Sequence, residues 1–389
     1  MPTINIVEKH LTRPTGMVDT DIVYIPGSAN KSDAPELPVL CSTVSDLTTN
    51  FGTMTKPETD EALTVAGYAS YMMAKQLLEK GMMVLYENVD LSYDALSSAI
   101  ERLSDKGSYN VKYITSGGFA NYGSESKNLY VTMLSTAANR GDCVALIETK
   151  SDADFDGTYK ALAITSTGKE YGAMFAPWRT YDLPAVGGAV ESIKLPGCFA
   201  YLSCLASSLK TSPNWLAIAG VTRGVVADLS KESDDFKMTN VMADNLQPTD
   251  EGQAVNAITE IKPYGDVIWG NRTLASVTGG LNSKHFLNTR NMINDIKKVS
   301  YTAAKELMFE QNSDTLWARF KSRVTPLLEQ LKSGNGISDY KLIKTTVKED
   351  GTPVAKYELA CNIRIYPIYA VEAFDITVSI SDQDASVGE

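Results

Sequence analysis

The segment YGDVIWGNRTLAS, residues 264–276, has features of both a catalytic loop and a structural corner. Gly265 and Gly270 permit sharp turns of the backbone. Trp269 offers a large apolar surface, and Arg272 can fix a corner by donating hydrogen bonds to a backbone carbonyl or a carboxylate. The rest of the sequence must show whether this segment is catalytic or structural.

The composition is that of a globular protein with a net negative charge. Of 389 residues, 43% are hydrophobic and 21% are charged, and the formal net charge is −11. A chain of this length usually folds as two or more domains. General nucleic-acid binding requires clustered Lys and Arg, so the overall charge argues against direct nucleic-acid contact.

The charge is unevenly distributed along the chain. The stretch from Lys284 to Lys344 holds 11 Lys or Arg against 6 Asp or Glu, a net of +5, which leaves −16 for the rest. Such a segment is typical either of a solvated helix surface or of a face that docks an acidic partner. The charge alone favours the solvated surface.

Cysteine usage and hydropathy indicate a soluble protein made in a reducing compartment. The five cysteines, at positions 41, 143, 198, 204 and 361, include no C-x-x-C pair and no zinc-ligand spacing. They are therefore interpreted as reduced core residues. We find no signal peptide and no apolar run of the roughly 18 residues that a membrane span needs, so no membrane insertion is expected.

Patterns for catalysis or cofactor binding are weak throughout the sequence. The only histidines are His10 and His285, and the absence of G-x-S-x-G argues further against a hydrolase triad. TSTGKEYG (165–172) lacks the first glycine and the magnesium-binding Ser or Thr of a phosphate loop. Asp152–Gly157 matches the first half of a calcium loop, but Ala163 replaces the bidentate Glu. We therefore expect no catalytic residues, no cofactor and no metal.

Hydrophobic periodicity predicts different structures in the two halves. The pattern over Thr59–Lys80 predicts a helix, and strands and helices then alternate to about residue 148, as in a layered α/β sheet. Residues 157–263 show no regular period. In the C-terminal third, apolar residues at helical spacing predict two long helices, with faces made of Met292, Ile296, Val299, Ala303 and Leu307 and of Trp317, Phe320, Val324, Leu327 and Leu331.

Short strands are predicted at both ends of the chain. Apolar residues alternate with polar ones over Tyr357–Ile365 and again over Phe374–Ile380, and a shorter pattern covers Ile4–Val7. The two terminal strands are too small to have cores of their own. Their backbone groups require partner strands.

Together these motifs resemble the tail sheath proteins of contractile phage tails and related contractile injection particles. YGDVIWGNRTLAS is similar to the family signature Gly-x-x-x-Trp-Gly-x-Arg-Thr-Leu. The helix pair that follows resembles the family pattern from Arg290 through Phe309-Glu310 to Leu316-Trp317, with Asn291 where a second arginine is frequent. SGNGISDYKL and RIYPIYAVEAFDITVSI resemble the closing turn and strands.

The resemblance implies a two-domain α/β fold, α+β overall, in which a layered middle domain is inserted in a C-terminal core domain. The expected parts are an N-terminal arm and strand that belongs to the core domain (1–24), a middle α/β domain (25–264) and the C-terminal core domain (265–389). Within it, Gly265, Trp269, Gly270 and Arg272 become a domain-junction motif, in which Trp269 would pack as an anchor.

The resemblance further implies a structural subunit that forms stacked hexameric rings around an inner tail tube and contracts to drive the tube through a cell envelope. Baseplate and tail terminator proteins are expected as further partners, in a virion tail or phage-tail-like particle assembled in the bacterial host cytoplasm. Neighbouring subunits would exchange strands through Ile4, Ile6, Val7, Phe374, Ile376, Val378 and Ile380. The candidate tube-facing basic residues are Lys297, Lys298, Arg319, Lys321 and Arg323.

Two alternatives from other classes stay open at this point. One is a non-contractile self-assembling tube or capsid component. The other is an α/β enzyme whose site escapes recognition, against which the missing triad, phosphate loop and metal cluster argue.

Overall fold

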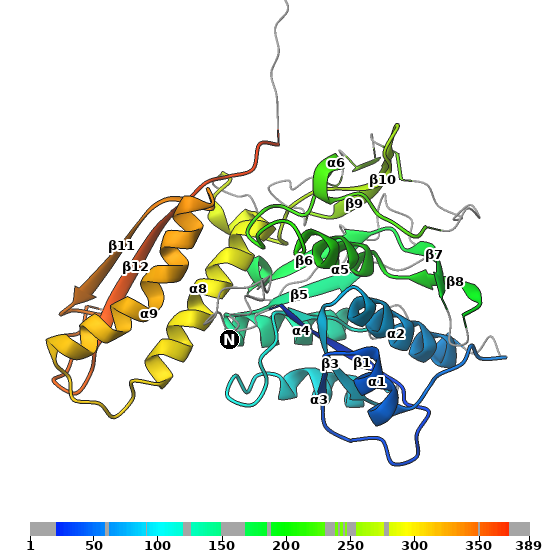
Figure 1. Cartoon of the computed structure of the whole chain (residues 1–389), viewed down its shortest axis with the longest axis horizontal. Helices are drawn as coiled ribbons and strands as arrows, with labels where there is room; N and C mark the ends of the chain where they lie inside the picture. The colour runs from blue at the N-terminus through cyan, green and yellow to red at the C-terminus, as the bar shows by residue number, and fades with distance from the viewer. Residues whose placement is uncertain are drawn as a thin grey trace, which may run out of the picture.

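A sheet domain lies beside a unit of two long helices and a β-hairpin (Figure 1). The computed structural model describes residues 21–58, 62–90, 92–119, 126–148, 168–184, 188–229, 238–239, 242–243, 246, 254–275, 280–348 and 351–372.

An eight-stranded sheet forms the centre of the sheet domain, in the order β10-β9-β6-β5-β4-β1-β3-β2. The six inner strands pair in parallel, and β2 and β10 pair antiparallel at the edges. The inner strands are largely buried and apolar, as expected of a parallel sheet covered on both faces. The strands are β1 Ile22–Gly27, β2 Val39–Cys41, β3 Met83–Asn88, β4 Tyr113–Ile114, β5 Val144–Glu148, β6 Gly172–Ala176, β9 Asn256–Ile261 and β10 Gly265–Trp269.

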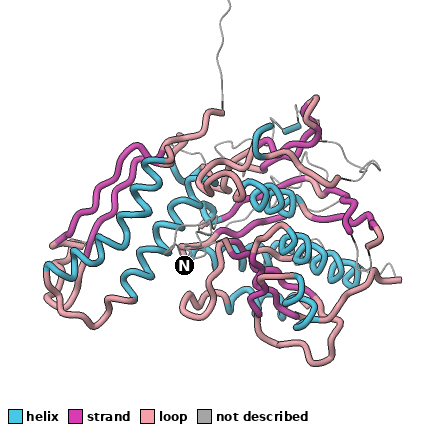
Figure 2. The backbone as a smooth tube through the Cα atoms, in the orientation of Figure 1, coloured by secondary structure: helices cyan, strands magenta, loops and turns pink. Residues whose placement is uncertain are grey.

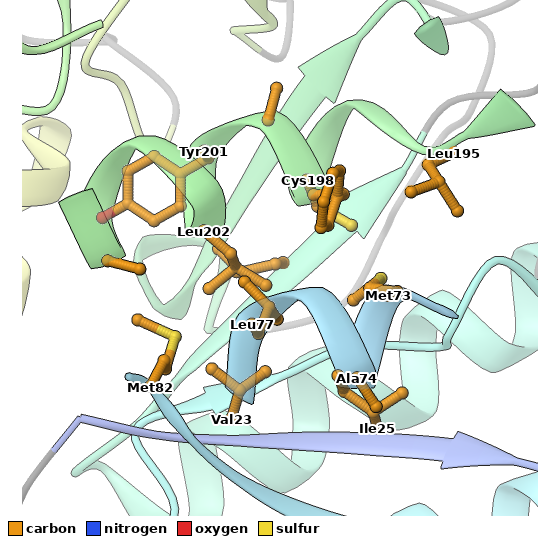
Figure 3. Packing of buried hydrophobic residues seen from close by; sticks show 14 of the residues in the cluster. Val23, Ile25, Met73, Ala74, Leu77, Met82, Leu195, Cys198, Tyr201 and Leu202 are labelled. Atoms are coloured by element: carbon orange, nitrogen blue, oxygen red, sulfur yellow. The ribbon is translucent and has the colours of Figure 1, made fainter. Parts of the chain in front are cut away.

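Helices cover both faces of this sheet and create two apolar layers. One face carries α1 Val44–Phe51, α2 Ala62–Glu79 and α5 Gly197–Ser208, and the other carries α3 Tyr93–Arg102 and α4 Ser126–Arg140. Figure 3 shows Leu202 of α5, Leu77 of α2 and Val23 of β1 within the first layer. The smaller elements are η2 Lys169–Tyr171, the hairpin of β7 Arg179–Pro184 with β8 Val190–Leu195, and α6 Gly220–Arg223.

The C-terminal unit has an apolar core of its own. It consists of η3 Ser283–His285, α8 Leu287–Lys305, α9 Asp314–Ser333 and the antiparallel hairpin of β11 Ile337–Thr345 with β12 Ala360–Pro367. Helix α9 lies between α8 and the hairpin (Figure 2). The core contains Met292, Ile296, Ala303, Leu307, Phe320, Val324, Leu327, Leu328, Leu331 and Ile337, together with Trp215 from the sheet domain.

Helix α8 presents an apolar face to α9 and a polar face to the sheet domain. Asn291 Nδ2 donates to the hydroxyl of Tyr201 at 3.0 Å, and Asn288 Nδ2 donates to the carbonyl of Trp215 at 3.1 Å. Lys298 Nζ donates to Asn110 Oδ1 at 2.7 Å. Hydrogen bonds and ion pairs therefore hold the two units together, and we refer to this interface as the polar seam.

A buried ion triad lies in the polar seam. The ammonium of Lys112, on the sheet side, lies 3.0 Å from Asp21 Oδ1 and 2.7 Å from Asp295 Oδ1, and its side chain is fully buried. Asn214 Nδ2 donates to Asp295 Oδ2 at 2.8 Å. The two carboxylates raise the pKa of Lys112 despite the burial that opposes it, so the ammonium stays charged.

The mixed α/β class expected from the sequence is confirmed, but the sheet extends past both predicted boundaries. Strand β1 crosses position 24 and lies inside the sheet between β3 and β4, so it does not belong to the C-terminal unit. Strand β10 starts at Gly265 and pairs with β9, so the sheet domain continues to Trp269. Residues 157–263, predicted as irregular, contain α5 and several strands.

Replacing Lys112 with Met is expected to destabilise the protein by about 3–5 kcal/mol, because two buried carboxylates lose their shared cation. The measurement is the free energy of unfolding from urea denaturation at neutral pH. Lys332→Met is the matched control, since Lys332 makes an exposed pair with Asp339. Equal losses for the two variants would contradict the central role of the triad.

Candidate functional site: the domain junction and the assembly surfaces

A buried asparagine, Asn256, helps to hold the segment that follows β10 at the corner. Asn256 Nδ2 donates to the carbonyls of Met174 and Arg272, and Asn256 Oδ1 accepts from the Arg272 backbone N–H at 2.7 Å. A Cβ at Gly270 would lie 2.8 Å from Asn256 Oδ1, so only glycine fits. Gly265 has a φ of 86°, which a turn into β10 requires.

Arg272 connects the sheet domain to the last part of the described chain. Its guanidinium carbon lies 4.6 Å from the centre of the Phe286 ring, and its Nη2 forms an ion pair with Glu372, one hundred residues further on. Burial raises the pKa of Glu372, and the attraction to Arg272 opposes that rise. These contacts join distant segments of the chain, as a structural corner does.

Trp269, the aromatic residue of the motif, does not pack as the predicted anchor. It is 43% exposed, because β10 is an edge strand and the Trp269 side chain lies outside both apolar layers. It lines a cavity of about 750 Å³ between the sheet domain and the C-terminal unit. Trp215 and Tyr369 contribute further aromatic walls, and Arg223 lies at the same cavity.

The β11–β12 hairpin offers the clearest surface for assembly. Ile363 and Ile365 pack toward α9, while Arg364 and Tyr366 point to the exposed face. Each strand has one neighbour within the described residues, so each has an edge without a strand partner there. An isolated two-stranded hairpin is marginally stable, and added strands would complete its hydrogen bonding.

The predicted tube-facing residues do not form one basic surface. The prediction is wrong for Lys298, whose side chain is buried. Its Nζ donates to Asn110 Oδ1 and to the Val111 carbonyl at 2.7 Å each, so it is not available to an outside partner. Lys297 Nζ is exposed, but it donates to the carbonyl of Gly141 and the hydroxyl of Tyr171 on the sheet domain.

The three candidates on α9 lie on the other side of the helix pair. Arg319 forms an ion pair with Glu310 at 3.4 Å, and Arg323 forms one with Glu306. Lys321 is exposed on the same helix. Two of the three candidates on α9 therefore pair with acidic residues near the turn between α8 and α9.

Several sequence predictions concern residues outside those that the structure describes. These are the terminal strand residues Ile4, Ile6, Val7, Phe374, Ile376, Val378 and Ile380, and the acidic segment Asp152–Gly157. Among the described residues, no cluster of His, Cys, Asp and Glu side chains is arranged to hold a metal ion. Within the same part of the chain, no helix combines the length and apolar character needed to cross a membrane.

Comparison with known proteins places these features in context. Residues 282–381 match the family model described as the phage tail sheath C-terminal domain, a span that begins just before α8. The tail sheath protein of Vibrio phage KVP40 is 21% identical over 180 residues, which are 46% of this chain and 26% of that protein. The chain thus matches about a quarter of the length of this curated relative.

Solved structures show the same fold over almost the whole chain. A chain in the baseplate structure of the anti-feeding prophage has a TM-score of 0.69 at 13% identity and covers 98% of this chain and 99% of its own. A chain in the contracted sheath complex of the extracellular contractile injection system PVC has a TM-score of 0.67 at 15% identity, with 99% of each chain covered.

These matches support membership of the contractile tail sheath family. The proteins similar to this chain are tail sheath proteins and components of contractile injection systems. The family is structural in character. Sequence reasoning found the helix pair and the corner, but it missed Asn256 and Glu372 as the partners of the Arg272 segment, because neither lies near it in the sequence.

Replacing Gly270 with Ala is expected to cost about 1–3 kcal/mol, because the new Cβ must displace Asn256 and its hydrogen bonds. Gly265→Ala is the matched comparison, since a Cβ there meets open space and only the positive φ is unfavourable, at about 1 kcal/mol. Chemical denaturation of both variants gives the difference. A smaller cost for Gly270→Ala than for Gly265→Ala would contradict the packed corner.

The stability of the polar seam is expected to depend on pH through Lys298, whose pKa burial lowers to about 8. The unfolded chain binds this proton more tightly than the folded chain does. The free-energy cost of burying the charged ammonium, which is present at pH 7, is therefore relieved as the pH rises above 8. Between pH 7 and 9 the wild type should gain about 1 kcal/mol relative to Lys298→Met. The free energy of unfolding at both pH values tests this, with Lys297→Met as the control that should show no such gain.

Proposed function

We propose that this protein is the repeating subunit of a contractile sheath, stacked as hexameric rings around an inner tail tube. The observation that carries the proposal is the β11–β12 hairpin, whose strand edges have no partner among the described residues, within a region that matches the sheath C-terminal domain. The structural neighbours from a contracted sheath complex and from the anti-feeding prophage baseplate support the same assembly class.

Strand exchange would supply the missing edges of the hairpin. Ile4–Val7 and Phe374–Ile380 have the alternating pattern of added strands, and neighbouring subunits would donate them. Main-chain hydrogen bonds then link the rings, and alternate apolar side chains fill the gaps between the strands. Such links keep the lattice connected while each subunit changes its position.

Contraction would draw on the lattice as a whole. The sheath assembles around the tube in an extended state of higher free energy, and a baseplate signal releases the first ring. Subunits then move outward and form new contacts, which drives the tube through a cell envelope. Exposed charges such as Arg319, Lys321 and Arg323 on α9 suit a releasable tube contact, because surface ion pairs are individually weak.

This function defines the partners and the location of the protein. The partners are other copies of the chain, the inner tube protein, and baseplate and terminator proteins, without nucleic acid or membrane insertion. The location is a virion tail or phage-tail-like particle, assembled in the bacterial host cytoplasm. A non-contractile tube differs from this in one observable respect, because its particles have a single length and diameter.

The purified chain is expected to form tubes visible by negative-stain electron microscopy. Removing residues 1–12, or all residues after Ala373, should leave a folded subunit that no longer forms tubes, because the donated strands are lost. Circular dichroism checks the fold and sedimentation velocity checks assembly. Tubes that form normally from both truncated chains would contradict strand exchange, and a wild type that is monomeric at every concentration would contradict the sheath function.

A further inference from the structure

The turn between α8 and α9 carries an aromatic side chain that no other described residue covers. Phe309 is fully exposed, and its neighbour Met308 is 62% exposed. Phe309 also has a φ of 66°, a left-handed backbone conformation that is unfavourable for a bulky residue. A bulky residue held in such an unfavourable backbone conformation points to a functional role. We call residues 308–310 the knob.

The cavity beside Trp269 offers a matching receptor. Its volume of about 750 Å³ falls in the range of ligand pockets, and Trp215, Trp269 and Tyr369 give it aromatic walls. The guanidinium of Arg223 lines the same cavity, and its Nε donates to the carbonyl of Ala217 at 2.9 Å. Arg272 and Glu372 also line the cavity and pair with each other, whereas no ion pair joins Arg223 to a carboxylate of the described residues.

The charges of the knob and the cavity are complementary. Glu310 directly follows Phe309, and its carboxylate is half exposed in a pair with Arg319 at 3.4 Å. An exposed ion pair of this kind is worth little, so Glu310 can exchange partners at low cost. An aromatic ring followed by a carboxylate fits a cavity with aromatic walls and a guanidinium.

The knob cannot enter the cavity of its own chain. The knob follows the C-terminus of α8, whereas the cavity includes Asn288 at the start of the same helix. Helix α8 has 19 residues, which at 1.5 Å per residue separates its ends by roughly 28 Å. A knob that fills the cavity must therefore belong to another molecule, and a second copy of this chain carries one.

We infer that Phe309 of one copy inserts into the cavity of a second copy, with Glu310 reaching Arg223. The knob and the cavity are different surfaces, so the contact is head-to-tail and repeats from copy to copy. Such a contact generates rings or helical polymers. The inference rests on the proposed sheath function and adds to it a contact through side chains, separate from strand exchange.

The test compares variants of the full chain by the concentration at which tubes form, measured by sedimentation and negative-stain microscopy. Phe309→Ser removes the knob and Ala219→Trp fills the cavity, and each should raise that concentration at least tenfold. Tyr357→Ser is the matched control, since Tyr357 is 87% exposed but belongs to neither surface. Thermal unfolding of Phe309→Ser should match the wild type, because the side chain supports nothing in its own chain.

Charge reversal gives a sharper test of the pairing. Glu310→Arg and Arg223→Glu should each weaken tube formation. The chain carrying both changes should recover it, because positions 310 and 223 then again carry opposite charges. If Phe309→Ser and Ala219→Trp form tubes like the wild type, the knob contact is wrong while the sheath function stands. If the double reversal is no better than the single ones, Glu310 does not meet Arg223.

Discussion

The arrangement of the two units depends on the ammonium of Lys112 between Asp21 and Asp295. Lys112 belongs to the sheet domain and Asp295 to α8, while Asp21 immediately precedes β1, so one buried cation joins three distant parts of the chain. Removing Lys112 would leave two carboxylates facing each other away from water, and removing either carboxylate would take one of its two partners from the buried ammonium. The triad therefore fixes the position of α8 more strictly than apolar packing alone would, since apolar surfaces tolerate sliding.

The corner after β10 is likewise held in position by buried polar contacts. Asn256 uses both ends of its amide to hold the backbone at Arg272, and Arg272 in turn holds Glu372. Glu372 is the last residue of the described chain, two positions before the segment 374–380 that is proposed for strand exchange. The corner therefore holds in place the residue from which that segment continues.

The sequence predicted the elements with a clear hydrophobic period and missed those without one. Helices α2, α8 and α9 and strand β12 follow regular spacing of their apolar residues, so their positions were predictable. Helix α5 was missed because it is buried on nearly all sides, which removes the polar face that marks a helix. The burial of Lys298 was missed because a lysine in a basic stretch is expected to be exposed, and only the fold brings Asn110 and Val111 to it.

The two faces of α8 have a consequence for how such proteins diversify. The apolar cores of the two units are almost separate, with Trp215 as the main residue of the sheet domain in the C-terminal core. A polar seam can be rebuilt by changing a few side chains, whereas a shared apolar core must be repacked as a whole. The C-terminal unit is therefore suited to inheritance as a module, kept constant while the domain attached to it is replaced or enlarged.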